Sequence, residues 1–345
     1  MKFSAPIRYI LIFVFMCTLI ACKNTDKGNS ATNSMHEAPI VIGNGVYYWK
    51  TSFEWNNYDQ EFIDKHSIKR LYLRVFDVDY DKESCMSVPI ATVRFKDKVP
   101  EHLEIVPVVY ITTASLKDID YYINDLYSRI RAIAKRNGFP NVREIQLDCD
   151  WTATNKDLYF NLCKKLKSIA SKDHIIISAT IRLHQLSQEA PPVDRGVLML
   201  YNTGSIYDPS TENSILNSND VKPYLRERID YSIPLSVAYP TYAWGILIRK
   251  NQFMAILHKT DFSDESQYKK VKENIYEVIQ EHYLENKQLH IGDKIRLENS
   301  DMCEISAVQC MVKEKVSSIE SVVLYHLDSL NMSKYSNEEI EKILK

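Results

Sequence analysis

The chain has 345 residues, of which 45% are hydrophobic, 26% charged and 11% aromatic. This composition is typical of a globular protein and excludes a disordered chain, a collagen-like repeat and a small disulfide-stapled scaffold. Lysine and arginine number 43 and aspartate and glutamate 45, so the net charge is −2 and no basic excess exists to bind nucleic acid. The sequence contains neither G-x-G-x-x-G nor G-x-x-x-x-G-K-[ST], and no cofactor is predicted.

The first 21 residues are typical of a targeting segment. Two basic residues precede a mostly apolar run, residues 9–20, which is too short to span a bilayer comfortably. The run ends in LIAC, residues 19–22, which resembles the cleavage box of bacterial lipoproteins; an ordinary signal peptide or a short membrane anchor is the alternative. The resemblance predicts removal of residues 1–21, lipidation of Cys22 and attachment to a membrane of the bacterial cell envelope, in the periplasm or on the surface.

Residues 22–38 are polar and lack periodicity, which is typical of a flexible tether. The remainder, residues 39–345, is expected to form one domain. Five cysteines follow Cys22 without a C-x-x-C pair, so neither a disulfide framework nor a structural zinc site is predicted. A single bridge between Cys303 and Cys310 is the one pairing that the spacing suggests.

In this domain, short apolar runs alternate with amphipathic stretches, which is the pattern of βα units. Helices are predicted over residues 116–136, 155–170 and 338–345. Residues 78–100 contain an extended piece and no helix. Strands are predicted at residues 46–49, 70–77, 104–111, 144–150, 174–180, 196–201, 233–239 and 321–327.

Eight strands in this order predict a (β/α)8 TIM-like barrel, somewhat irregular in its connections. The alternative, an open doubly wound sheet, usually has a glycine-rich first turn, which is missing here. Between the last two strands, residues 242–318 are interpreted as an insertion on the barrel. It is expected to hold a hairpin at residues 245–259, a helix near residues 266–285 and an extended piece at residues 289–297.

The strongest signal for chemistry is the run EIQLDCDWT at the end of the fourth strand. Because side chains alternate along a strand, Asp148 and Asp150 share the face that points into the barrel, at the mouth where barrel enzymes carry their catalytic groups. Two carboxylates so close repel each other, which favours a proton on one of them. Asp150 is therefore predicted as a general acid and Asp148 as its electrostatic partner. The structural alternative is an ion pair with Arg74 or Arg182.

Aromatic and polar residues follow several other strands and suit a sugar ligand, because flat rings stack on sugar rings and tyrosine and tryptophan present a polar tip. The alternatives are aromatic packing beneath loops and a salt bridge at the barrel rim. His326 and Asp328 end the eighth strand, but no spacing supports a metal site. The predicted substrate-binding residues are Trp49, Arg74, Asp77, Trp151, Arg182, His184, Tyr201, Asn202, Tyr239, Tyr242 and Trp244.

Together these motifs resemble the family 18 chitinases. In that family strand four ends in D-x-x-D-x-D-x-E, strand six carries M-x-Y-D or M-x-Y-N, and strand seven carries P-x-Y followed by tryptophan. Two positions depart from the pattern: the first acidic position is Ile145, and the proton-donating glutamate is replaced by Thr152, whose hydroxyl cannot donate in its place. The matching residues are Asp148, Asp150, Met199, Tyr201, Asn202, Pro240, Tyr242 and Trp244.

Six blocks of the chain, among them LYLRVFDVD and YPTYAWGILIR, are also similar to an uncharacterised bacterial family of predicted barrel lipoproteins, a domain of unknown function. This resemblance implies a barrel and no established activity. The first hypothesis is therefore a lipid-anchored, glycoside-hydrolase-like envelope protein that acts on or binds a polysaccharide, without the usual chitinase activity. The alternatives are a non-catalytic carbohydrate-binding barrel and an envelope scaffold whose mouth binds a protein partner.

Overall fold

The computed structural model describes residues 42–345, apart from the side chains of residues 119–121, so the predicted signal segment, Cys22 and the tether lie outside the described residues. Residues 42–345 form one compact unit. No helix within this part of the chain is both long and apolar enough to cross a bilayer.

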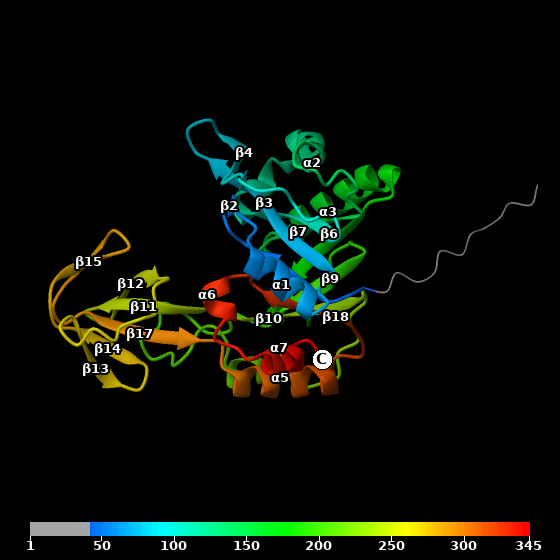
Figure 1. The fold of residues 1–345 in the computed structure, drawn as a ribbon. Helices are drawn as coiled ribbons and strands as arrows, with labels where there is room; N and C mark the ends of the chain where they lie inside the picture. The colour runs from blue at the N-terminus through cyan, green and yellow to red at the C-terminus, as the bar shows by residue number, and fades with distance from the viewer. Residues whose placement is uncertain (1–41) are drawn as a thin grey trace, which may run out of the picture. The chain divides into compact units, whose positions relative to one another are not determined.

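The first half of the unit alternates strands with helices (Figure 1). Its elements are β1 (Gly45–Tyr48), β2 (Ser52–Phe53), α1 (Asn57–Lys65), β3 (Arg70–Asp81), β4 (Met86–Ile90), β5 (Arg94–Phe95), β6 (Glu104–Ile111), η1 (Thr113–Lys117), α2 (Ile119–Arg136), β7 (Glu144–Asp148), α3 (Lys156–Ala170), η2 (Ser171–Asp173), β8 (Ile176–Ile181), η3 (Leu183–Gln185) and β9 (Arg195–Met199).

The second half contains the insertion and the closing helices. Its elements are α4 (Ser218–Val221), η4 (Lys222–Tyr224), β10 (Leu235–Pro240), β11 (Ala243–Arg249), β12 (Gln252–Leu257), β13 (Tyr268–Lys272), β14 (Ile275–Val278), β15 (His282–Leu284), β16 (Lys287–Leu289), β17 (Lys294–Asn299), α5 (Met302–Lys315), β18 (Ile319–Tyr325), α6 (Ser329–Met332) and α7 (Asn337–Ile343).

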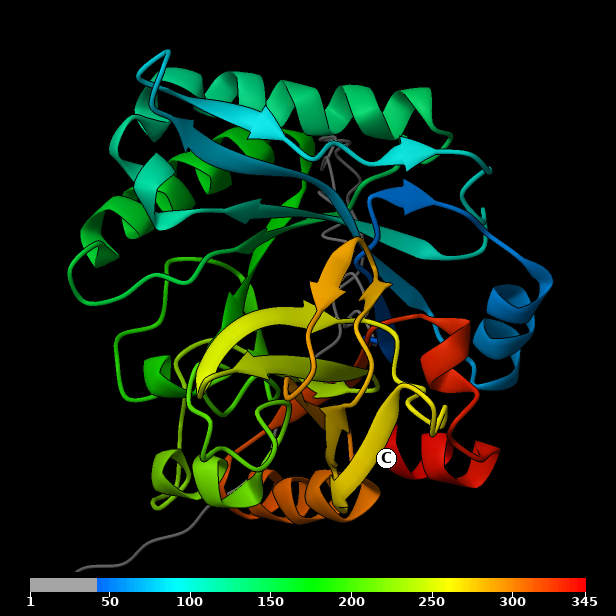
Figure 2. The ribbon, with the colours of Figure 1, turned by 90° about the vertical axis from the view of Figure 1, so that its left-hand side faces the viewer.

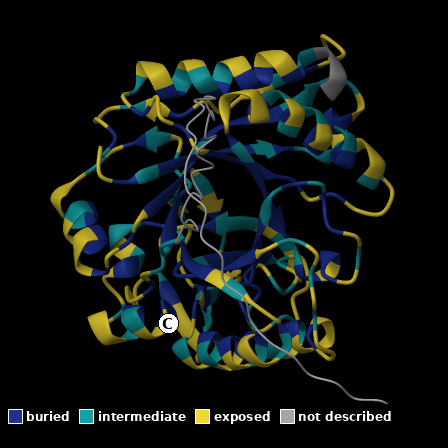
Figure 3. Ribbon diagram, turned by 90° about the vertical axis from the view of Figure 1, so that its right-hand side faces the viewer, coloured by how far each residue is buried: buried dark blue, intermediate teal, exposed yellow. Residues whose placement is uncertain are grey.

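Eight parallel strands close into a barrel in the order β1, β3, β6, β7, β8, β9, β10 and β18. The ring closes because β1 pairs on one side with β3, Gly45 opposite Arg70, and on the other with β18, Gly45 opposite Val323. Figure 3 shows the barrel end-on, with buried strands inside a ring of helices whose outer faces are exposed. The predicted barrel and its eight strands are confirmed. Their apolar runs are nearly continuous because parallel strands are buried on both faces.

Two connections lack the expected helix. Strand β3 continues beyond the barrel and pairs with β4 in antiparallel fashion, Asp77 opposite Ile90, which confirms that residues 78–100 form no helix. The link from β8 to β9 contains only the short turn η3. The ring of outer helices is therefore incomplete at these two connections.

The insertion is a five-stranded antiparallel sheet in the order β12, β11, β17, β14, β13, with the small hairpin β15–β16 beside it. It projects from one end of the barrel, at the left of Figure 1 and toward the viewer in Figure 2. Leu247, Leu257, Phe262 and Ile295 belong to a small hydrophobic core of its own. The expected hairpin is confirmed as β11–β12.

The helix predicted near residues 266–285 is wrong, because these residues form β13, β14 and β15. Residues Glu285 and Asn286 both have positive φ, 50° and 62°, and close a tight hairpin that a helical reading of the charged run overlooks. Val278, at the end of β14, pairs with Tyr268 of β13 and is buried in the core of the insertion. The helix of this region is α5, whose first turn is capped by the carboxylate of Asp301.

Cys303 and Cys310 both lie on α5 as free thiols. Seven residues of α-helix rise by about 10 Å, which is more than a disulfide can bridge. The bridge that the spacing suggests does not form.

Candidate functional site

Three charged side chains meet where β7 and β8 end. The carboxylate of Asp148 is buried, whereas that of Asp150 is 56% exposed. Arg182 reaches both: its Nη2 lies 2.9 Å from Asp148 Oδ1 and 2.6 Å from Asp150 Oδ1, and its Nε donates to Asp150 Oδ1 at 2.7 Å. Thr180 Oγ1 also donates to Asp148 Oδ1 at 2.6 Å. One guanidinium therefore holds both carboxylates.

This arrangement changes the expected chemistry of the pair. Burial alone would lower the pKa of Arg182, but the charges of Asp148 and Asp150 outweigh it and raise that pKa, so the guanidinium stays charged. Its charge removes the mutual repulsion on which the general-acid role predicted for Asp150 depends. Tyr110 on β6, which sequence reasoning did not single out, donates from its hydroxyl to Asp150 Oδ2 at 3.4 Å.

A wall of aromatic side chains continues from this cluster across the mouth. The ring of Tyr201 stacks on that of Tyr325 at the end of β18, with the centroids 4.3 Å apart. Tyr242 stands edge-on to both rings and donates from its hydroxyl to Asn202 Oδ1 at 2.6 Å. Asn202 has a φ of +55°, which asparagine tolerates better than most residues. Tyr201, Asn202 and Tyr242 therefore lie together, as predicted.

On the other side of Tyr325 lie the predicted residues of β1 and β3. The ring of Trp49 is 5.9 Å from that of Tyr325, and the Arg74 guanidinium lies 5.6 Å from the centre of the Trp49 ring. Arg74 also forms a two-pronged ion pair with Asp77, in which its Nε lies 2.7 Å from Asp77 Oδ1. Trp49 and Arg74 thus lie beside Tyr325 at this mouth, and Arg74 and Asp77 are paired with each other.

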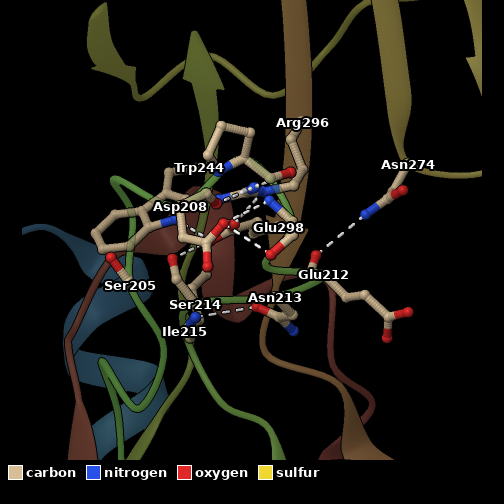
Figure 4. Close-up of polar contacts among 12 residues, drawn as sticks. Ser205, Asp208, Glu212, Asn213, Ser214, Ile215, Trp244, Asn274, Arg296 and Glu298 are labelled. Atoms are coloured by element: carbon tan, nitrogen blue, oxygen red, sulfur yellow. Dashed lines mark hydrogen bonds and ion pairs between the residues drawn. The ribbon is translucent and has the colours of Figure 1, made fainter. Parts of the chain in front are cut away.

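Trp244 is held from behind by a buried polar network (Figure 4). Its Nε1 donates to Glu298 Oε2 at 2.7 Å, and the other oxygen of Glu298 accepts from Arg296 Nε at 2.6 Å. Ser214 also donates to Glu298, and Arg296 Nη1 donates to the carbonyl of Asp208 at 3.0 Å. The network joins the insertion to the loop after β9. Glu298 lies 54 residues from Trp244 in the chain, and only the pairing of β11 with β17 places the two opposite each other.

A cleft of about 690 Å³ opens between the barrel mouth and the insertion. His326 contributes a neutral imidazole to its wall, because burial lowers the pKa of that side chain to about 4. The aromatic and amide groups of the wall are Trp49, Asn202, Tyr242, Trp244 and Tyr325.

Seven of the eleven predicted binding residues do not line this cleft. Four of them have the contacts described above, namely Arg74, Asp77, Arg182 and Tyr201, and the other three lie elsewhere. Tyr239 is buried outside the barrel, where it borders α5 beside Gln309 and Val312, because it occupies the outward-facing position of β10. Trp151 is fully buried, with its ring stacked on Tyr159 of α3. His184 is exposed on η3 and is not among the residues that line the cleft.

The fold is similar to solved structures of carbohydrate-active barrels. One is the spore cortex-lytic enzyme SleL of Bacillus cereus, with a TM-score of 0.50, 15% identity, and coverage of 88% of this chain and 73% of that chain. Another is a chitinase from Chromobacterium violaceum, with a TM-score of 0.52, 8% identity, and coverage of 88% and 98%. At these identities the likeness shows the fold alone, a TIM-like barrel, as the chitinase resemblance implied.

The sequence matches no protein-family model, and a search of curated proteins finds no significant match. Membership of the uncharacterised barrel lipoprotein family therefore stays a prediction.

Proposed function

We propose that this protein binds a polysaccharide at the C-terminal mouth of its barrel and does not hydrolyse it by the chitinase mechanism. The observation that carries the proposal is the cleft, in which Trp49, Tyr242 and Trp244 offer ring faces and edges and Asn202 offers an amide. Its volume of about 690 Å³ is within the range of small-molecule sites. The structural likeness to a chitinase and to a spore cortex-lytic enzyme supports a carbohydrate as the ligand class.

The acidic residues favour binding over hydrolysis. Thr152 stands where a proton donor is needed, and its hydroxyl is hydrogen-bonded to that of Thr154 at 2.9 Å. A retaining glycosidase of the two-carboxylate type also needs one carboxyl group free to attack. Here Asp148 and Asp150 share the guanidinium of Arg182.

Hydrolysis with Asp150 as the acid is the second candidate, and the 56% exposure of the Asp150 carboxylate favours it. An Asp150→Asn variant separates the two: under the second candidate turnover vanishes and binding persists. If the protein only binds, neither the native chain nor the variant releases product.

We also propose that the barrel is held to a membrane of the cell envelope by a lipid on Cys22, with residues 22–38 as a tether. The proposal is supported by the LIAC motif, residues 19–22, which resembles the cleavage box of bacterial lipoproteins. A tether of this length would let the cleft reach glycans near the membrane.

The test is binding of the full chain, solubilised in detergent, to a glycan array, followed by titration of each ligand found. Trp244→Ala is expected to weaken binding by about twofold to tenfold, because it removes one stacking ring. Tyr239→Phe is the matched control, since Tyr239 faces α5 and its replacement should leave affinity unchanged. Absence of any bound glycan, or equal affinity in the Trp244 variant, would contradict the proposal.

A further inference from the structure

The cleft has a wall of lysines as well as a wall of aromatic rings. Lys50 follows β1, Lys259 follows β12 and Lys334 follows α6, so three distant segments bring ammonium groups to one cleft. Lys334 Nζ forms no ion pair among the described residues; it donates to Asn331 Oδ1 at 3.2 Å and to Thr260 Oγ1 at 3.4 Å, and the charge of Asp328 acts on it from farther away.

The other two lysines also form no ion pair within residues 42–345; the charges of Glu54 and Asp59 act on Lys50, and those of Asp261 and Asp264 act on Lys259, from beyond ion-pair distance. Lys50 lies over the ring of Tyr48, with its Nζ 5.4 Å from the ring centre, and it forms no ion pair there. The backbone N–H of Lys259 donates a hydrogen bond to Glu285 Oε1 at 2.5 Å. The ammonium group of Lys259 forms no ion pair in this part of the chain. All three charges are therefore available to a ligand.

The two carboxylates of the cleft are already engaged with backbone groups. Asp328 Oδ1 accepts from Leu330 N at 2.9 Å and caps α6, and Asp261 Oδ1 accepts from Ser263 N at 3.0 Å. With His326 neutral, three ammonium groups face two carboxylates. The cleft is thus positive in a chain whose net charge is −2.

We infer that the cleft takes an acidic polysaccharide, one whose sugar units carry carboxylate or sulfate groups. The inference rests on the proposed function, because the aromatic wall would hold the sugar rings while the lysines bind the anions. A neutral polymer such as chitin would leave the three ammonium groups of the cleft without a direct ion-pair partner, and two carboxylates of the cleft would face three positive charges. Binding of an anionic ligand instead gives each lysine a partner and releases small counterions.

The first test compares ligands that differ in charge, using the full chain in detergent and isothermal titration. The anionic probes are oligogalacturonate, hyaluronan, chondroitin and chondroitin sulfate oligosaccharides; the neutral probes are chitopentaose, cellopentaose and the methyl ester of oligogalacturonate. We expect at least one anionic probe to bind more tightly than every neutral one. Its affinity should fall as salt rises from about 0.05 M to about 0.5 M, because salt screens exposed charges. Chondroitin and its sulfated form distinguish a carboxylate from a sulfate as the preferred group.

The second test removes the lysines one at a time. Lys334→Gln and Lys259→Gln should each weaken binding of the anionic probe by about twofold to fivefold, the range of exposed ion pairs. Lys172→Gln is the matched control, because it makes the same charge change on η2, before β8 and hence at the opposite end of the barrel.

The outcomes separate this inference from the proposed function. If neutral probes bind as tightly as anionic ones, or if both lysine variants bind like the native chain, the acidic ligand is refuted while carbohydrate binding stands. If no probe binds at all, both proposals fail.

Discussion

Arg182 is the residue on which the barrel mouth depends most. It neutralises a buried carboxylate, Asp148, and an exposed one, Asp150, and Thr180 completes the hydrogen bonding of Asp148. A buried charge that loses its partner is costly, because neither water nor a counter-ion stabilises it. The same residue therefore stabilises the mouth and offsets the repulsion between the two carboxylates.

Replacing Arg182 tests this directly. Arg182→Met should lower the free energy of unfolding by about 3–5 kcal/mol, as expected for a buried ion pair that loses one partner. Urea denaturation measures the change. Asp150→Asn is the control and should cost less than about 1 kcal/mol, because that carboxylate is largely in solvent. A neutral effect of Arg182→Met would show that the three charges do not form the pairs described.

His326 links folding stability to pH. Burial is the main cause that lowers its pKa to about 4; Lys50 and His258 act in the same direction and Asp328 opposes them. The ordinary pKa of histidine is about 6.5. Between these two values the unfolded chain binds a proton that the folded chain does not, so the free energy of unfolding falls as pH falls.

The expected loss from His326 between pH 7 and pH 4 is at most about 3 kcal/mol. Urea denaturation at pH 7 and pH 4 measures it, with His326→Asn as the comparison. The variant should lose less stability than the native chain over this interval. Equal losses would mean that His326 is not buried as a neutral imidazole.

At the scale of single elements, the end of β7 determines how deep in the mouth a carboxyl group lies and so whether it can donate a proton to a ligand. The strand ends at Asp148, and Thr152 lies in the turn that leads into α3, where its N–H donates to Asn155 Oδ1 at 2.7 Å. In the family 18 chitinases the proton donor corresponds to position 152, two residues after Asp150. Two residues of extended chain advance by about 6.6 Å, so the carboxylate of Asp150 lies about that much deeper in the barrel than such a donor. Asp is also one methylene shorter than Glu.

We therefore expect the native chain to release no product from chitopentaose, as measured by mass spectrometry. Thr152→Glu should release product slowly but measurably, because it supplies the missing donor while Arg182 still holds the two aspartates. Thr152→Gln, which has the same length and no acid, should stay inactive. Efficient cleavage by the native chain would show that Asp150 or another acid replaces the donor.

At the scale of the whole molecule, the cleft exists because the insertion stands beside the mouth of the barrel. The ends of β1, β9, β10 and β18 supply Trp49, Asn202, Tyr242 and Tyr325, and the insertion supplies Trp244 and residues 258–261. The insertion is anchored there by the Glu298 network under Trp244. The site is therefore a product of the full compact unit and not of any one motif.

Anchoring is a prediction for the whole chain. Cys22→Ser should leave the protein unprocessed or released from the membrane, because lipid can no longer be attached. Membrane fractionation and the mass of the product measure this. A membrane-bound protein of normal processed size in the variant would refute a lipid on Cys22.

The sequence by itself determined the barrel and much of the mouth. Its eight apolar runs are β-strands because each is buried on both faces, and this signal is local to each run. Alternation along the chain correctly placed Asp148 and Asp150 at one mouth with Tyr201, Tyr242 and Trp244. Such residues could be named because strand ends of a parallel barrel all meet at one rim.

Only the tertiary structure decided what those residues do there. Tyr239 and Trp151 lie at the same strand ends, yet they occupy outward-facing positions, where the helices α5 and α3 cover them. The charged run at residues 266–285 folds as strands because pairing with β17 outweighs its helical pattern. Arg182 binds two aspartates, and Trp244 donates a hydrogen bond to Glu298. Both contacts join residues more than 30 positions apart in the chain. Partnerships of this kind arise from strand register and burial across the barrel, which no local pattern of the sequence encodes.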